Sequence, residues 1–542
     1  MKKKSIFSMF LVILLGAVVI SACTPTNQAN DPSAPAVTGA TTPATGTPAP
    51  AAATSARAVP SLPPGEGAVG SLAIAIGTEA PSIAPARHNH QIAILKNFMT
   101  HERLFEQHYD TLIPTPLLVR EWHAISDVLF EFTLHEGITF SNGEPLTAED
   151  VVASWYWVRE TPDARGVHIS AQGVEFVDRY TFRIYTGVPD AGLFYDLTSH
   201  GNSIMPKSLI EAGHDFNVDP VGSGTFIHEE WRTGDFLTFR ANPNYWNPER
   251  AARIEHVTWS IIPEGASRTI ALELDEVDFI FDVPLPDMPR LTADPDTTVF
   301  MRTSPVLNFL QLNHERPQFQ NIYARRAIMM AVNPQEIVDG AHDGFGYVQR
   351  SQLPIILPGA TNDGILPYDP DAARALLAEH GIDPASLAFE IVVSNEPFRR
   401  SAEIIQAQLG DIGIPVTINM MDSAAAWTVG TIGDQDAQFL NWNAAWIISF
   451  LRNHFLYSED IFNRNFMRND EISGFILEGI ATIDPAERAA VFEQATAAAN
   501  SYIAWIPTHL STNIRAFNAN LVAPELSGMT TILNVNSFYW SN

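Results

Sequence analysis

The period of the apolar positions changes within one stretch of this chain. Phe130, Phe132 and Leu134 alternate with polar neighbours, which predicts a strand with one buried face. An Asn-Gly pair at 142–143 predicts a tight turn, because both residue types tolerate positive φ. From Thr147, a residue type that caps helices, apolar residues recur at helical spacing. The stretch therefore predicts a strand, a turn and a helix in succession.

The last third of the chain predicts alternating strands and helices. Residues 389–394 and 416–420 are short apolar runs typical of strands, and apolar residues recur at helical spacing over 398–412 between them. A strand, helix and strand of this length predict a right-handed parallel crossover. Residues 437–442 predict a further strand. Ligands bind beyond the carboxyl ends of strands in open α/β sheets, so the next loop is the candidate binding segment.

Two tryptophans and two asparagines mark this candidate segment. Trp442 and Trp446 would offer flat apolar platforms, and Asn441 and Asn443 would supply amide donors and acceptors. We interpret all four as ligand-binding residues. The alternative for either tryptophan is a place in the hydrophobic core.

Net charge argues against some classes of partner, and the cysteine content rules out a disulfide within the chain. The 542 residues carry a formal net charge of −29, which argues against nucleic acid and anionic lipid surfaces as partners. Only 17% of the residues are charged, so the excess of acid is expected on solvated faces and identifies no cationic ligand. Cys23 is the one cysteine in the sequence, so no disulfide forms within the chain.

The N-terminal segment resembles a lipoprotein signal peptide. A basic start is followed by an apolar run over 6–20, shorter than the ~20 residues of a comfortable membrane span. The small residues Ser and Ala then precede Cys23, as in a lipobox. We predict that residues 1–22 are a signal peptide, that acylated Cys23 anchors the chain to the extracellular or periplasmic side of the cell membrane, and that residues 23–68 are a disordered tether. The alternative is an ordinary signal peptide with an incidental cysteine.

Two long stretches of the chain contain recognisable motifs. The first motif lies in residues 130–154 and is carried by Thr133, Leu134, Gly137, Phe140, Ser141, Gly143, Pro145, Leu146, Thr147, Ala148, Asp150 and Val151. The second covers residues 220–246, where Gly222 and Gly224 are expected to let the backbone turn tightly. Both motifs resemble those of extracellular solute-binding proteins, family 5, the peptide- and nickel-type receptors of ABC importers. Before the first motif, residues 91–105 predict a helix.

The resemblance implies an α/β chain with a two-lobed, periplasmic-binding-protein-like fold of type II. An extra subdomain is expected in the first lobe. The expected divisions are lobe I at 69–107, 218–307 and 506–542, its subdomain at 108–217, and lobe II at 308–505. The implied partners are an ABC permease and its ATPase subunits. The protein is expected to act as a monomer without a cofactor or a bound metal.

The family favours a peptide as the ligand, but one position departs from its pattern. Peptide-binding members carry Trp-x-x-Asp in the candidate loop, and the aspartate holds the ammonium group of the peptide. Ala445 stands at that position, so an aspartate introduced there is expected to improve the binding of peptides with a free amine. An oligosaccharide or a metal chelate is the alternative ligand, and His88, Asn89 and His90 form a second candidate contact, or else an ordinary polar loop.

An enzyme is a less favoured interpretation. The sequence holds no H-E-x-x-H, Walker loop, complete G-x-G-x-x-G or C-x-x-C motif. A secreted hydrolase built from scattered carboxylates stays open as the alternative of a different class, because paired carboxylates have no fixed spacing. We predict a receptor that does no chemistry.

Overall fold

The predicted strand, turn and helix are present in the computed structural model, which describes residues 68–87, 90–162, 164, 170–456 and 465–541. Strand β5 is Leu129–Leu134, and its alternate residues are buried. Helix α2 is Ala148–Glu160, and the Asp150 carboxylate accepts the backbone N–H of Thr147 at 2.8 Å. This bond closes a capping box at the helix start.

The first motif belongs to a small antiparallel sheet covered by α2. Its strand order is β4-β5-β7-β6. The other strands of this sheet are β4 (Val119–Ser126), β7 (Thr181–Tyr185) and β6 (Gly173–Phe176), and β4 and β6 form its edges. Phe132 lies opposite Phe182, and their rings stack at a centroid distance of 5.4 Å. These rings and the apolar face of α2 share one buried cluster.

The largest sheet of the described residues has eleven strands. Ten of them follow one another in the order β15 (Val416–Met420), β14 (Phe389–Val393), β16 (Ala437–Asn443), β12 (Thr297–Leu312), β17 (Trp505–Asn518), β11 (Phe279–Phe281), β1 (Ser71–Ile76), β10 (His256–Ile261), β9 (Phe236–Ala241) and β8 (Phe226–Arg232). The last strand, β13 (Gly346–Val348), pairs with β17. The predicted parallel pairing across the helix is confirmed, because β14 and β15 pair in parallel.

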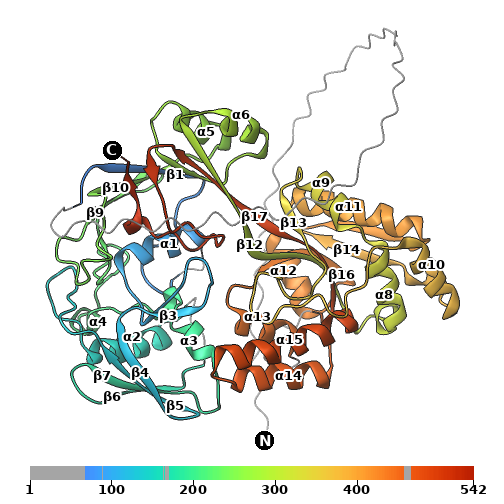
Figure 1. The fold of residues 1–542 in the computed structure, drawn as a ribbon, viewed down its shortest axis with the longest axis horizontal. Coiled ribbons are helices and arrows are strands. Elements are labelled where there is room, and N and C mark those ends of the chain that lie inside the picture. Colours follow the sequence, from blue (N-terminus) through green and yellow to red (C-terminus); the bar gives the residue numbers. More distant parts are fainter. Residues whose placement is uncertain (1–67, 88–89, 163, 165–169, 457–464, 542) are drawn as a thin grey trace, which may run out of the picture. The chain divides into compact units, whose positions relative to one another are not determined.

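Two long strands connect the two halves of this sheet. The N-terminal part of β12 pairs with the C-terminal part of β17, next to β11. The other ends of both strands pair beside β16 and β13. The register between β12 and β17 shifts between Thr303 and Leu307, midway along β12. Figure 1 shows both strands running from one group of strands to the other.

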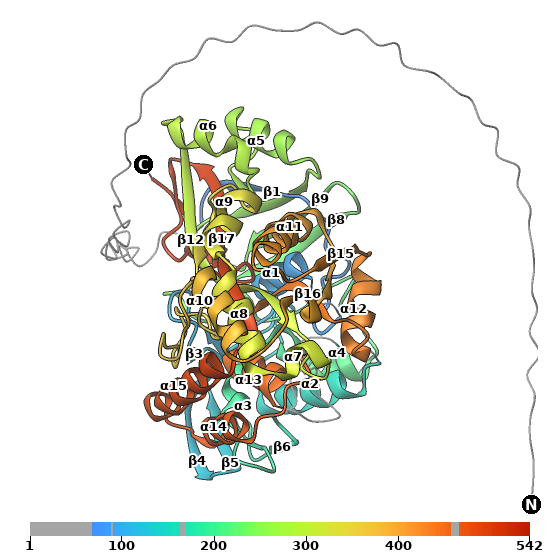
Figure 2. The ribbon, with the colours of Figure 1, turned by 90° about the vertical axis from the view of Figure 1, so that its right-hand side faces the viewer.

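Helices cover both halves of the sheet (Figures 1 and 2). The helices of the described residues besides α2 are α1 Gln91–Thr100, α3 Gly192–Asp196, α4 Lys207–Glu211, α5 Gly265–Glu273, α6 Met288–Ala293, α7 Pro317–Gln320, α8 Ile322–Ala331, α9 Pro334–Ala341, α10 Pro370–Glu379, α11 Glu396–Asp411, α12 Ser423–Ile432, α13 Ile447–Phe455, α14 Asp470–Ala481 and α15 Pro485–Tyr502. Two short strand pairs complete the described chain: β2 (Phe105–Gln107) with β3 (Pro114–Pro116), and β18 (Leu521–Val522) with β19 (Tyr539–Trp540).

Helix α1 ends five residues before the predicted position, where the second motif packs against it. The predicted helix ran to residue 105, whereas α1 ends at Thr100 and residues 105–107 form β2. The carbonyl of Thr100 accepts the N–H of Gly224 at 2.9 Å. A Cβ on Gly222 would lie 2.2 Å from the Thr100 carbonyl oxygen, and neither glycine has a positive φ. The expected reason for these glycines is therefore wrong: they permit close backbone contact with α1.

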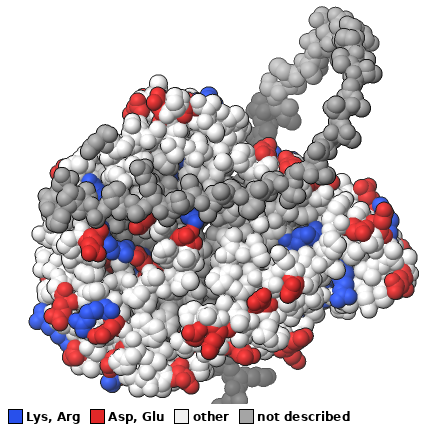
Figure 3. Space-filling model, in the orientation of Figure 1, with Lys and Arg blue, Asp and Glu red and all other residues white. Residues whose placement is uncertain are grey.

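Acidic residues are dispersed over the surface, as the composition predicts. Asp and Glu are spread over the face drawn in Figure 3, and Lys and Arg are fewer. No helix in the described part of the chain is long and apolar enough to cross a membrane.

Candidate functional site

A cavity of about 800 Å³ opens beside the midpoint of the two long strands. Its walls come from β16, α13, β12, β17, α1 and two loops. The lining residues are Ile94, Ser199, His200, Ser304, Val306, Asn441, Trp442, Asn443, Trp446, Ser449, Phe450, Asn453, Ser511, Thr512, Asn513, Thr530 and Thr531. Ser304 and Val306 lie where the register of β12 and β17 shifts.

The four candidate residues all lie on this cavity, but three of them belong to the end of β16 and only Trp446 lies in the loop after it. Asn441, Trp442, Asn443 and Trp446 line it together. Asn441 is exposed, and the other three are half-buried. The Trp442 ring stacks on Trp427 at 6.0 Å, so one ring supports the other at the cavity wall.

The second candidate set does not join this wall. His90 is half-buried at the start of α1 and does not line the cavity. His88 and Asn89 lie outside the described residues. Within the described part of the chain, no group of three or more His, Cys, Asp or Glu residues could hold a metal ion.

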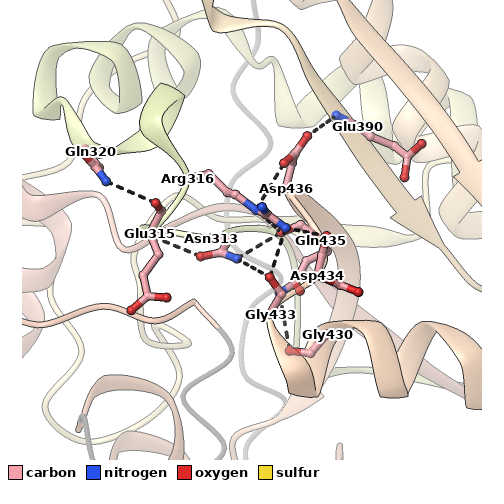
Figure 4. A network of polar contacts seen from close by, with 10 residues as sticks. All are labelled: Asn313, Glu315, Arg316, Gln320, Glu390, Gly430, Gly433, Asp434, Gln435 and Asp436. Atoms are coloured by element: carbon pink, nitrogen blue, oxygen red, sulfur yellow. Dashed lines mark hydrogen bonds and ion pairs between the residues drawn. The ribbon is translucent and has the colours of Figure 1, made fainter.

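A polar network fixes the start of β16, the strand that delivers Trp442 (Figure 4). The side-chain amide of Asn313 donates to the carbonyls of Gly433 and Gln435 at 3.1 and 3.0 Å. The Arg316 guanidinium donates to the same two carbonyls and pairs with the Asp436 carboxylate at 3.4 Å. The turn before β16 is thus held by the segment after β12, and the far end of β16 is held by pairing with β12.

Ala445 is placed differently from its neighbours. It is 1% exposed, it packs in an apolar cluster, and it does not line the cavity. Its carbonyl accepts the side-chain amide of Gln107 at 3.0 Å. An aspartate at this position would be buried among apolar side chains, which argues against the expectation that it would face a ligand ammonium group.

The other cavity residues were not predicted from the sequence, and most of them share one chemical character. They are serines, threonines and asparagines from segments far apart in the chain, and they lie on no motif: Ser199, Ser304, Ser449, Asn453, Ser511, Thr512, Asn513, Thr530 and Thr531. The Asn308 amide, on β12, donates to the Ser511 hydroxyl at 2.9 Å and so orients one of them. Small polar residues of this kind are common on any surface, and only the fold gathers them.

A smaller cavity of about 50 Å³ shares Trp446 and Thr531 with the large one and contains charged groups. The buried Glu102 carboxylate accepts bonds from the Tyr245 hydroxyl at 2.6 Å and the Trp246 indole N–H at 2.9 Å. Burial raises the pKa of Glu102, and these bonds partly offset that effect. The network ties the segment that follows α1 to Tyr245 and Trp246 at the end of the second motif.

Comparisons with known proteins agree with this architecture. The sequence profile described as "Bacterial extracellular solute-binding proteins, family 5 Middle" matches residues 114–458. The chain is 24% identical over 469 residues to the glutathione-binding protein GsiB of Salmonella typhi, covering 83% of this chain and 90% of that protein.

Solved structures show the same fold. HbpA2 from Haemophilus parasuis superimposes with a TM-score of 0.78 at 23% identity, over 87% of this chain and 100% of that one. The periplasmic binding protein DppA from Helicobacter pylori, solved in complex with the peptide STSA, superimposes with a TM-score of 0.70 at 20% identity, over 88% and 99%. The predicted α/β, type II periplasmic-binding-protein-like fold is confirmed.

Proposed function

Because this chain belongs to the bacterial extracellular solute-binding proteins of family 5, whose members serve ABC importers, we propose that it captures a solute in the cavity beside β16 and delivers it to an ABC permease. The permease and its ATPase subunits are the proposed partners. The protein acts as a monomer, and it binds its solute without changing it chemically. Relatives in the family are binding proteins and not enzymes.

The position of the cavity carries this proposal. Its walls include Ser304 and Val306, at the irregular midpoint of the long strands, and Trp442, at the end of β16. A solute held there contacts the connection between the two halves of the sheet. Binding therefore shifts the population of the conformations that this connection allows, and the permease recognises the bound form.

The relatives support a peptide-type solute. One is named for glutathione, a peptide derivative, and another was solved with the peptide STSA. The cavity of about 800 Å³ lies in the range of sites for small ligands, which are ~300–1,000 Å³. A peptide-sized solute is the ligand that we propose.

We also propose that the protein is tethered to the outer face of the cell membrane. The support is the lipobox-like sequence at Cys23 and the Pro-, Thr- and Ala-rich stretch that follows, both outside the described residues. Two acyl chains on one cysteine supply anchoring that a single chain does not. A tethered receptor stays close to its permease.

Native mass spectrometry of the protein as purified, followed by calorimetry with the solute that it retains, tests this function. We expect saturable one-to-one binding and recovery of unchanged solute. Trp442→Ala should weaken binding about tenfold or more, because it removes an aromatic face from the wall. Trp122→Ala, at a position that does not line the cavity, should leave binding unchanged. Turnover of the solute would instead favour the hydrolase alternative.

A further inference from the structure

We infer that the cavity selects a solute that is uncharged where it is bound and that offers hydroxyl or amide groups. This inference rests on the proposed function. Of the lining residues that the structure describes, eleven are Ser, Thr or Asn, and none is Asp, Glu, Lys or Arg. His200 is the one histidine among the described lining residues.

The lining matches groups that both donate and accept hydrogen bonds. Hydroxyl and amide side chains do both, as do the hydroxyls of a sugar and the amides of a peptide backbone. A free ammonium or carboxylate loses hydration free energy on entering a cavity, and this loss is poorly offset unless an opposite charge is present. The described part of the wall offers no such charge, so charged ends of a solute are disfavoured there.

Two arginines next to lining positions are already paired. Arg452, which precedes Asn453, pairs with Asp190 at 2.8 Å. Arg302, two residues before Ser304, pairs with Asp110. Neither arginine lines the cavity, so neither stands ready to receive a carboxylate of the solute.

The charges in the adjoining smaller cavity are balanced as well. Glu102 and Glu106 face Arg103 and Arg250 there, two acids against two bases. Arg250 binds Glu106 at 2.7 Å, and the Arg103 guanidinium lies 3.5 Å from the centre of the Phe98 ring. This cavity, of about 50 Å³, has room for little more than water. The large cavity therefore receives no uncompensated charge from its neighbour.

Flat apolar faces complete the wall. Trp442, Trp446 and Phe450 line the cavity with the polar residues. Aromatic faces bind the apolar faces of sugar rings or of small side chains, while the surrounding hydroxyls and amides bind the polar edges. Two sources share this chemistry: a neutral oligosaccharide, and a peptide whose termini are blocked or joined.

Three mixtures of probes, which differ in whether their ends are charged, test the inference. A mixture of tetrapeptides with uncharged side chains is prepared with free termini and again with acetylated and amidated termini, and a third mixture contains neutral tri- and tetrasaccharides. Retention is measured by native mass spectrometry and thermal shift. We expect the blocked peptides or the saccharides to be retained at least tenfold more tightly than the free peptides. Which neutral mixture is retained identifies the source.

Adding one negative charge to the wall should reverse this preference. Asn441 is exposed and lines the cavity, so Asn441→Asp adds a carboxylate there with almost no change in shape. The variant should bind amidated peptides with a free amine about tenfold more tightly than the wild type. Asn244→Asp, also exposed but away from the cavity, is the matched control and should change nothing.

The outcomes separate the inference from the proposed function. Free peptides retained as tightly as blocked ones would overturn the inference and leave the receptor function standing. The same holds if Asn441→Asp and Asn244→Asp behave alike with the cationic peptides. If no mixture is retained and none raises the melting temperature, both the inference and the proposed function fail.

Discussion

Several buried histidines make the fold sensitive to acid. His314 is 8% exposed, and its Nε2 lies 2.8 Å from the carbonyl oxygen of Ala504. Burial lowers the pKa of His314 to about 3, and it does the same for His101 and His509. In the unfolded chain the pKa of each returns to about 6.5. The unfolded chain thus binds more protons between pH 6.5 and 3, so the free energy of unfolding falls as the pH falls through this window.

His314→Gln should reduce this acid sensitivity. Glutamine keeps an N–H that can donate to Ala504 but does not titrate. At pH 5 the wild type loses roughly 2 kcal/mol of stability through this one histidine relative to neutral pH, and the variant should not. Urea unfolding at pH 7 and pH 5 measures the difference. The exposed His256→Gln is the control, and equal acid slopes in all three proteins would contradict the prediction.

Ala445→Asp should destabilise the protein without creating an amine site. The side chain is buried in an apolar cluster, and a carboxylate there would be uncompensated. The expected loss is about 3 kcal/mol or more. Thermal unfolding measures it, with exposed Ala424→Asp at the start of α12 as the control. An unchanged melting temperature with tighter binding of free-amine peptides would restore the expectation from sequence.

The sequence predicted for some residues, but not for others, whether the side chain faces the cavity or the core. Trp442 and Trp446 were assigned by the rule that ligands bind beyond strand ends, and both line the cavity; their contact with solute stays a prediction. Ala445 lies between them in the chain yet is buried, because the chain turns into α13 there. A loop sequence does not reveal which of its side chains the turn will bury.

At the scale of elements, the contact between α1 and the second motif depends on two glycines. A Cβ on Gly224 would lie 2.3 Å from the Met99 carbonyl oxygen, closer than real contacts allow. The clash is with backbone at the end of α1, which has no flexible side chain to move aside. This contact also encloses His101, which is fully buried beside Val221.

Gly224→Ala should therefore lower the free energy of unfolding by about 1–3 kcal/mol or more, because the added methyl group overpacks the contact. Gly474→Ala is the matched control, and it should raise the free energy of unfolding instead of lowering it. Gly474 is exposed on α14 with nothing within 4 Å of its Cβ position, so alanine should stabilise that helix by about 1 kcal/mol. Equal effects of the two substitutions in urea unfolding would contradict the packing argument.

Elements with a strong period were predicted well, and elements shaped by distant contacts were not. The strands at 389–393 and 416–420 and the helix between them agree with the sequence pattern. The predicted end of α1 was wrong, because apolar residues continue past Thr100 into β2. The end of that helix is set by the glycine loop of the second motif, more than 100 residues away in the chain.

At the scale of the whole molecule, the predicted lobe boundaries fall inside β12 and β17. The expected changes at 307–308 and 505–506 lie within or at the start of strands that span Thr297–Leu312 and Trp505–Asn518. Each of these strands pairs with partners in both halves of the sheet. No local sequence pattern marks a lobe boundary within a strand that both halves of the sheet share. The division into lobes stays a prediction.

Membrane attachment has its own test at this scale. Cys23→Ala should abolish acylation and move the protein from the membrane fraction to soluble material or unprocessed precursor, because no acyl chains remain to insert. Fractionation with mass spectrometry of the N-terminus measures both effects. Cys23→Ser, which also lacks the thiol, should behave like the alanine variant. Unchanged membrane attachment without lipid on the wild-type N-terminus would contradict the proposed anchor.

Small-angle scattering with a solute of verified affinity tests the central claim most directly. If the protein is a receptor that closes around its solute, saturation should lower the radius of gyration, raise the melting temperature by mass action and leave the solute unchanged. The compaction should follow the binding curve and require higher solute concentrations in Trp442→Ala. An unchanged scattering profile at saturation, or conversion of the solute to product, would contradict the account.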